Sequence, residues 1–240
     1  MAFPGLSNIG PIYRREIRSY FNSPVAYVVI VVFLAIVGWF FTSDMFLANI
    51  ASMRIVFELV PLVFLFFIPA VTMRLLAEEK KSGTLELLTT KPVRDGEIVL
   101  GKFFAAWTLL AATLAPTLIY LVTMMVLGNP DPGPVLSGYI GLMFMGGVYI
   151  AIGIFASSLT ENQIVAFIIS FLFVLALYLA DKVLIYVPEG FVSTLEFLSI
   201  DYHFDNIARG VIDSRNIVYF GSLLGFTLLL ATASLQRRKW

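Results

Sequence analysis

The sequence predicts an all-α integral membrane protein that crosses the bilayer six times. Hydrophobic residues make up 59% of the chain and charged residues 13%, whereas soluble domains are roughly a quarter charged. Six apolar stretches are long enough to cross the hydrocarbon core, which takes about 20 residues of helix. A length of 240 residues suits one membrane domain, residues 1–240, without an additional soluble enzyme domain.

Residues 1–24 are expected to form an amphipathic helix on the inner membrane surface. Within "PIYRREIRSYFNSP", the apolar Ile12, Ile17 and Tyr20 alternate with Arg14 and Arg18 at helical spacing. The basic residues would face anionic headgroups. A proline is tolerated at the first position of a helix, so Pro24 is expected to begin the first span.

The six expected spans are 25–42, 55–73, 103–127, 138–158, 164–180 and 217–235. Pro61, Pro69 and Pro116 are expected to kink the second and third spans. The fourth span has small residues four apart, Gly147 with Ala151 and Gly153 with Ser157, which lets helices pack closely. The outer segment 181–216 contains a stretch, 183–200, interrupted by proline, glycine and glutamate. We expect it to form short surface or re-entrant helices.

Basic residues determine the expected orientation. An even number of spans puts both termini on one side, and that side would carry 12 of the 16 lysines and arginines, against 4 on the other. The positive-inside rule therefore predicts that both termini are cytoplasmic.

The cytoplasmic loop 77–101 is unusually charged, because residues 78–102 hold ten of the 32 charged side chains. Gly83 is expected to break the preceding helix, and Thr84 to cap a short leucine-rich helix, 84–90, that ends before Pro92. Asp95 is expected to cap the third span. The leucines of the short helix would then point into water or into a partner.

Several chemical classes are disfavoured. Cysteine is absent, which excludes disulfides and thiolate chemistry, and zero net charge gives no reason to expect nucleic acid. Ionisable residues near a membrane midplane are lacking, which argues against an ion-coupled carrier. Arg54 and Glu58 are expected to pair at the outer interface, with a polar contact in a translocation path as the alternative. His203 is expected to be solvated, and it offers a thin basis for a metal site.

Residues 96–103, "GEIVLGKF", nearly match a phosphate-binding loop. Phe103 stands where a magnesium-binding Ser or Thr belongs, and the filler is bulky and helix-forming. Real phosphate-cradling geometry is therefore implausible. If ATP drives this protein, another chain must bind it.

The stretch "EEKKSGTLELLTTKPVRDGEIVLGK" resembles the first cytoplasmic loop of ABC-2 type permeases. Its acidic-basic run, Gly-Thr pair, leucine-rich helix, proline and Gly-Lys all match that pattern. The late stretch "DYHFDNIARGVIDSRNIVYF" and the ending "LQRRKW" most resemble the gliding-motility-associated branch, with the nitrous-oxide-reductase maturation permease as a near relative. The resemblance implies an ABC-2, type V exporter-like fold in a prokaryotic cytoplasmic (inner) membrane.

The resemblance also implies partners. The short helix would be a coupling helix that docks on a separate cytoplasmic ABC ATPase, with two ATPase and two permease chains per transporter, the permeases forming a homodimer or a paralogous heterodimer. ATP and magnesium would bind the ATPase, so this chain would carry no catalytic, cofactor or metal residue. The implied docking residues are Glu78, Glu79, Gly83, Thr84, Leu85, Glu86, Leu87 and Leu88, with Lys80 and Lys81 also at the rim. A second, smaller inner contact would lie in the turn 157–163, at Ser158, Thr160, Glu161 and Asn162.

The family's substrate path runs between permease chains, lined largely by the second and fifth spans. The matching residues here are Phe57, Glu58, Phe64, Phe67, Phe171 and Tyr178. An aromatic wall suits an amphiphile, a lipid-linked glycan or a peptide better than a small ion, although these side chains equally fit lipid contact or helix packing. The alternative function is a non-transporting subunit that transmits the ATPase state to an envelope motility or secretion machine, with a possible accessory envelope protein.

Overall fold

The computed structural model describes residues 8–47, 53–85, 93–127, 131–183, 196–211 and 213–237. These residues form helices joined by short turns, without a strand in the described ranges. Six helical segments are long and apolar enough to cross a membrane. The predicted all-α class and six spans are therefore confirmed.

The helices follow the expected order, with several extensions. α1 (Ile9–Asn22) precedes α2 (Pro24–Leu47), α3 (Arg54–Thr72) and α4 (Arg74–Lys81). α6 (Asp95–Leu114), the 3-10 turn η1 (Ala115–Thr117) and α7 (Leu118–Leu127) together make the third span. α8 (Pro132–Leu159) and α9 (Gln163–Lys182) follow, then α11 (Ile200–Ala208) and α12 (Ser214–Gln236).

The helix boundaries follow from local sequence. Ser23 is extended (φ −100°, ψ 143°) and separates α1 from Pro24. Asp131 caps α8 by accepting a hydrogen bond from Gly133 N. Pro116, where a kink was predicted, lies in the 3-10 turn that interrupts the α-helix of the third span, whereas Pro61 and Pro69 lie within α3. Asp95 was predicted to cap α6, but Arg94 occupies that position and Asp95 begins the helix. The prediction was one residue too late because Glu97, not Asp95, accepts the hydrogen bond from the capping residue's N–H.

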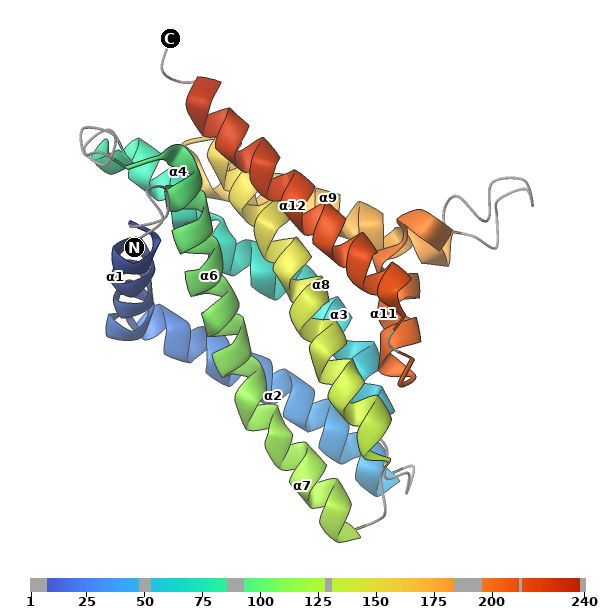
Figure 1. The fold of residues 1–240 in the computed structure, drawn as a ribbon. Coiled ribbons are helices and arrows are strands. Elements are labelled where there is room, and N and C mark those ends of the chain that lie inside the picture. The colour runs from blue at the N-terminus through green and yellow to red at the C-terminus, as the bar shows by residue number, and fades with distance from the viewer. Residues whose placement is uncertain are drawn as a thin grey trace, which may run out of the picture.

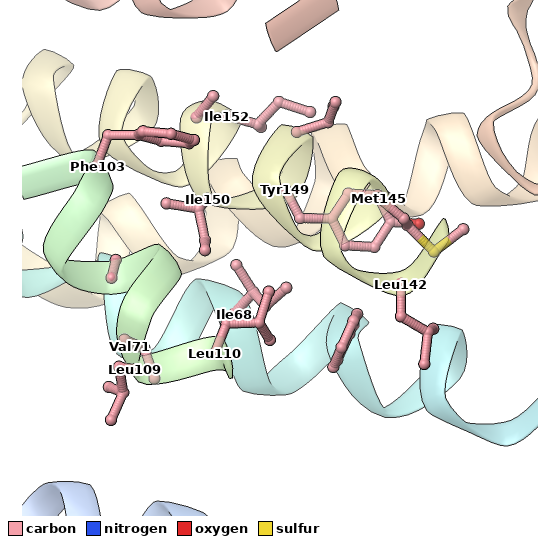
Figure 2. Close-up of a cluster of buried hydrophobic side chains, with 14 of the residues drawn as sticks. Ile68, Val71, Phe103, Leu109, Leu110, Leu142, Met145, Tyr149, Ile150 and Ile152 are labelled. Atoms are coloured by element: carbon pink, nitrogen blue, oxygen red, sulfur yellow. The ribbon is translucent and has the colours of Figure 1, made fainter. Parts of the chain in front are cut away.

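α8 is the centre of the bundle (Figure 1). Of its most apolar window, 78% is buried, against 17 to 56% for the other five spans. It packs against α3, α6, α9, α11 and α12. Figure 2 shows Leu142 and Ile150 of α8 pointing toward α3 and α6, which contribute Ile68 and Leu110 to the same buried cluster.

Close packing of α8 depends on its small residues. A Cβ on Gly146 would lie 2.3 Å from Leu110 Cδ2, and one on Gly153 would lie 2.0 Å from Thr72 Oγ1. The predicted pair of Gly153 and Ser157 faces the junction of α3 and α4: Gly153 packs against Thr72, and Ser157 Oγ donates a hydrogen bond to Met73 O. These contacts are helix packing of the kind that small residues permit.

One end of the bundle gathers the segments that the sequence assigns to the cytoplasm. α1, the last turn of α4, the start of α6 and the ends of α8 and α12 all lie there (Figure 1). The predicted inner segments thus occupy a single end of the molecule.

Candidate functional site

The candidate docking segment is reached through α4, and α8 sets the direction of that helix. Met73, whose backbone angles are helical (φ −52°, ψ −33°), separates α3 from α4, which continues it. Ser157 Oγ of α8 accepts hydrogen bonds from Leu76 N (3.0 Å) and Ala77 N (2.9 Å) and donates one to Met73 O (2.9 Å). Because the first N–H groups of a helix lack intrahelical partners, one buried hydroxyl stabilises the start of α4.

The far end of α4 is also attached to α8. Lys80 is buried, and its Nζ donates a hydrogen bond to the carbonyl oxygen of Ser158. Ser234 Oγ of α12 donates to the same carbonyl at 3.3 Å. The ends of α4, α8 and α12 therefore meet at a single backbone group.

Gly83 ends α4, as predicted. Ser82 N donates to Glu78 O (3.0 Å) and Gly83 N to Lys80 O (3.2 Å), and Gly83 has φ +69°. A left-handed residue after a helix is a common stop signal, and glycine adopts it without strain. Thr84 and Leu85 then begin a new helical turn. Thr84 was predicted to cap this helix, but it is already helical, and its Oγ1 donates a hydrogen bond to Glu79 O at 3.3 Å.

Exposure divides the predicted docking residues. Glu78 and Thr84 are exposed, whereas Glu79 is largely covered and Leu85 is only 7% exposed. The prediction that the leucines point into water or a partner is therefore wrong for Leu85, which joins the chain's own core. Spacing alone cannot separate a leucine that faces a partner from one that faces its own bundle. The remaining predicted docking residues, Glu86, Leu87 and Leu88, lie outside the described residues.

The second predicted contact is the turn between α8 and α9. Asn162 Oδ1 accepts from Ile164 N (2.9 Å) and starts α9, while Thr160 Oγ1 accepts from Asn162 N (3.1 Å). Glu161 and Asn162 are exposed at the tip. Ser158, by contrast, is 1% exposed and serves as the attachment point for Lys80 and α12.

A four-charge network, absent from the sequence-based prediction, joins α1, α4 and α6. Lys102 Nζ of α6 is 3.1 Å from Glu16 Oε1 and 3.0 Å from Glu79 Oε2. Arg15 pairs with the same two carboxylates, at 2.8 Å from Glu16. Lys102 is 1% exposed. Alternating two cations with two anions satisfies charges that would be costly to bury singly.

The charge pairing affects Glu16 directly. Burial opposes the charged form of this carboxylate, but the neighbouring Lys102 and Arg15 outweigh burial and lower the pKa of Glu16 below its usual value. The network was hidden from sequence reasoning because Glu16 lies in a basic helix and Lys102 ends a charged loop. The one available signal was an acidic residue on the covered face of α1.

Two further contacts hold α1 on α6. A Cβ on Gly101 would lie 2.7 Å from Ile12 Cγ2, so glycine permits the close approach. Asn8 N and Nδ2 donate to the two carboxylate oxygens of Glu97, each at 3.2 Å. The Gly-Lys pair that mimics a phosphate loop therefore contributes a packing glycine and a buried cation. Residues 96–103 are helical within α6.

The aromatic residues assigned to a path separate into two groups. Phe57 and Phe64 are buried within the chain, Phe57 against Tyr139 and Phe64 against Phe33. Phe67 also packs on Phe33, at 5.3 Å between ring centroids.

An outward aromatic group joins α3 and α9. Phe171 lies 5.0 Å from Phe66 and 6.1 Å from Phe167, measured between ring centroids, and Phe66 is 56% exposed. Tyr178 lies near the end of α9, with Lys182 over its ring. Glu58 pairs with Arg54 at 2.6 Å, and both side chains are exposed, which confirms the predicted ion pair.

His203 corrects an expectation. It was predicted to be solvated, yet it is 5% exposed and stacks on Tyr219 with 3.9 Å between ring centroids. Its Nδ1 lies 2.8 Å from Asn216 Oδ1 and its Nε2 lies 3.1 Å from the Phe197 carbonyl. The reason is that α11 folds onto α12, which covers a residue that local sequence places in a polar loop.

Comparison with known proteins gives one family. The model of a family described as ABC-2 family transporter protein matches residues 11–237. A search among curated proteins found no match. The matched range includes α1, both predicted docking segments and every described helix that could cross a membrane.

Proposed function

The chain belongs to the ABC-2 family of transporter proteins and is the multi-pass permease subunit of an ABC transporter; on this premise, we propose that its partner ATPase docks on residues 83–88 and on the turn between α8 and α9. ATP and magnesium bind the ATPase chain, which supplies the hydrolysis. Glu78 and Thr84, with Glu161 and Asn162 of the second contact, offer exposed polar groups for docking. Such groups set the register and rate of association.

This proposal rests on one observation: both ends of α4 are hydrogen-bonded to α8, through Ser157 at its start and through Lys80 at its end. Displacement of residues 83–88 is thereby carried to α3, which α4 continues, and to α8, the centre of the bundle. ATP binding drives transport only if the ATPase contacts two permease states differently. The α4 attachment supports a route by which such a difference reaches the membrane helices.

The proposed orientation puts the end that holds α1, α4 and the start of α6 in the cytoplasm of a prokaryotic cell, with the chain in its cytoplasmic membrane. The excess of basic residues in these segments supports it. Two permease chains and two ATPase chains form the working assembly. A homodimer and a pair of paralogues satisfy this arrangement equally.

The proposed substrate is an amphiphile, such as a lipid-like molecule, a glycan on a lipid carrier or a peptide, which moves outward. The exposed ring of Phe66, with the half-buried rings of Phe167 and Phe171 beside it, supports a path along α3 and α9. Phe57 and Phe64 contribute by packing, since both are buried within one chain. The alternative, a subunit that transmits the ATPase state to a motility or secretion machine, shares these docking residues and rests on the resemblance to the gliding-motility branch.

Substitutions at one position test the docking. We expect Gly83→Pro to abolish co-purification of a co-expressed partner ABC ATPase, because proline holds φ near −65° while Gly83 has φ +69°. Gly83→Asn is the matched control, since asparagine tolerates a left-handed backbone and, apart from the two adjacent residues, no atom of the described residues lies within 4 Å of a Cβ there. Leu87→Asp should also abolish it. Retention of the ATPase by both Gly83→Pro and Leu87→Asp, with normal membrane insertion, would refute the docking assignment.

A further inference from the structure

A polar pocket lies between α1, α4 and α6, beside the four-charge network. Its volume is about 400 Å³, within the range of small-molecule sites. Ser19, Ser23, Ser82 and Thr84 are among the residues that line it, and it opens to the surface. Glu78 and Thr84 of the proposed docking surface belong to the lining, but docking does not account for the buried part of the pocket, at Tyr20 and the four-charge network.

The charges that line the pocket leave one cation and one anion for a ligand. Arg15, Lys102, Glu16 and Glu79 neutralise one another in the network. The other two charged residues of the lining, Arg74 and Glu78, form no salt bridge within the part of the chain that is described. Arg74 lies over the Tyr20 ring, 5.7 Å from its centroid. A ligand with one negative and one positive group would complement the charges of Arg74 and Glu78.

Tyr20 supplies an independent sign of a ligand. The residue is 3% exposed, and among the described residues its hydroxyl has no hydrogen-bond partner, although it lines the pocket. An unpaired buried hydroxyl destabilises the fold, and tyrosine hydroxyls usually find a partner when they are buried. Burial raises the pKa of Tyr20, so the hydroxyl keeps its proton and can donate to an anionic oxygen.

The pocket lies where helices leave the apolar layer. Arg74 is the first charged residue after the apolar run of α3, Ser23 directly precedes the first span, and Lys102 directly precedes Phe103. Phospholipid phosphates and their amines occupy this level in a bilayer, which has polar headgroup regions outside a hydrocarbon core about 30 Å thick.

We propose that this pocket binds the zwitterionic headgroup of a phospholipid that carries a phosphate and a primary amine. Arg74 and the Tyr20 hydroxyl bind the phosphate, and Glu78 accepts from the ammonium group. The site joins α1 to α4, so an occupied pocket steadies the helix that leads to residues 83–88. The proposed lipid site requires only that this end of the bundle lies at a membrane leaflet, so its test is independent of the test of ATPase docking.

Lipid titration of the full chain tests the site. Dioleoyl phosphatidylethanolamine is added to the protein in dodecyl maltoside micelles, and bound lipid is counted by native mass spectrometry. We expect Arg74→Gln and Tyr20→Phe each to weaken binding about tenfold, as expected for losing a hydrogen bond to a charged group. Arg18→Gln and Tyr27→Phe are the matched controls, because neither residue lines the pocket, and binding should be unchanged.

Headgroup chemistry gives the second comparison. The unaltered chain should prefer phosphatidylethanolamine to phosphatidylcholine, whose trimethylammonium cannot donate a hydrogen bond, and Glu78→Gln should reduce that preference. Tyr20→Phe should leave the thermal midpoint in lipid-free micelles unchanged or higher, since it removes an unpaired hydroxyl. Equal binding by Arg74→Gln and Arg18→Gln would overturn the site. Displacement of the lipid by an equal concentration of inorganic phosphate would overturn its assignment to a lipid headgroup.

Discussion

Replacing Lys102 by methionine should release α1 from the bundle. The methionine fills much of the same volume but removes the cation that lies 3.1 Å from Glu16 and 3.0 Å from Glu79. The two carboxylates then share only Arg15, whose side chain is 48% exposed. Removing one partner from a buried ion pair costs about 3–5 kcal/mol. We expect about 3 kcal/mol, the low end of that range, because Arg15 remains and solvent reaches it.

Thermal unfolding in detergent measures this loss. For a chain of this size, about 3 kcal/mol lowers the unfolding midpoint by roughly 6–12 °C. Lys81→Met is the matched control, since Lys81 is exposed at the end of α4 and takes no part in the four-charge network, and its midpoint should not change. Because the chain has no cysteine, Ile12→Cys can report on α1. Its labelling by a maleimide should be slow in the otherwise unaltered chain and fast with Lys102→Met.

The triple replacement Glu16→Gln, Glu79→Gln and Lys102→Met separates charge from packing. Removing the whole network except Arg15 leaves no buried carboxylate without a cation, so much of the lost stability should return. An unchanged midpoint for Lys102→Met, or a triple variant less stable than Lys102→Met, would refute the argument that Lys102 stabilises the chain by compensating buried charge.

Two further outcomes follow from single contacts. Because Lys102 and Arg15 lower the pKa of Glu16 beneath its usual 4.5, Glu16 stabilises the fold above about that pH, and the contribution disappears as pH falls through the lower folded-state pKa. The thermal midpoint, measured as a function of pH, should therefore fall less steeply on the acid side for Glu16→Gln than for the unaltered chain. Gly153→Ala places a Cβ 2.0 Å from Thr72 Oγ1 and should cost about 1–3 kcal/mol through overpacking. Thr72→Ala should recover part of that loss in the thermal midpoint, and no recovery would exclude this clash as the cause.

The spans and their order were predictable because they depend on local composition. An apolar run such as residues 55–73 must be helical in a bilayer, where unpaired backbone groups are costly. Gly83 was predictable for a similar reason, since a glycine after a charged helical turn is a local stop signal. The ion pair of Arg54 and Glu58 followed from a spacing of four on one helix.

The candidate site was predictable only in part. The position of the docking segment followed from its sequence pattern, but the contacts that hold it come from residues far away in the chain. Ser157 is 80 residues away in sequence from Ala77, one of the two α4 residues whose backbone N–H groups it binds. Glu16 and Lys102 are 86 apart. No local pattern pairs such residues.

The sequence by itself determined the class, the number of spans and the place of the charged loop, and its basic residues predict the sidedness of the spans. These properties follow from the partition of each segment between water and hydrocarbon, which each segment undergoes on its own. The tertiary structure alone decided which side chains became buried. Leu85 and His203 turned inward, and Lys102 lost contact with solvent. Burial depends on which helices meet, and α8 brings those helices together through contacts that no single segment contains.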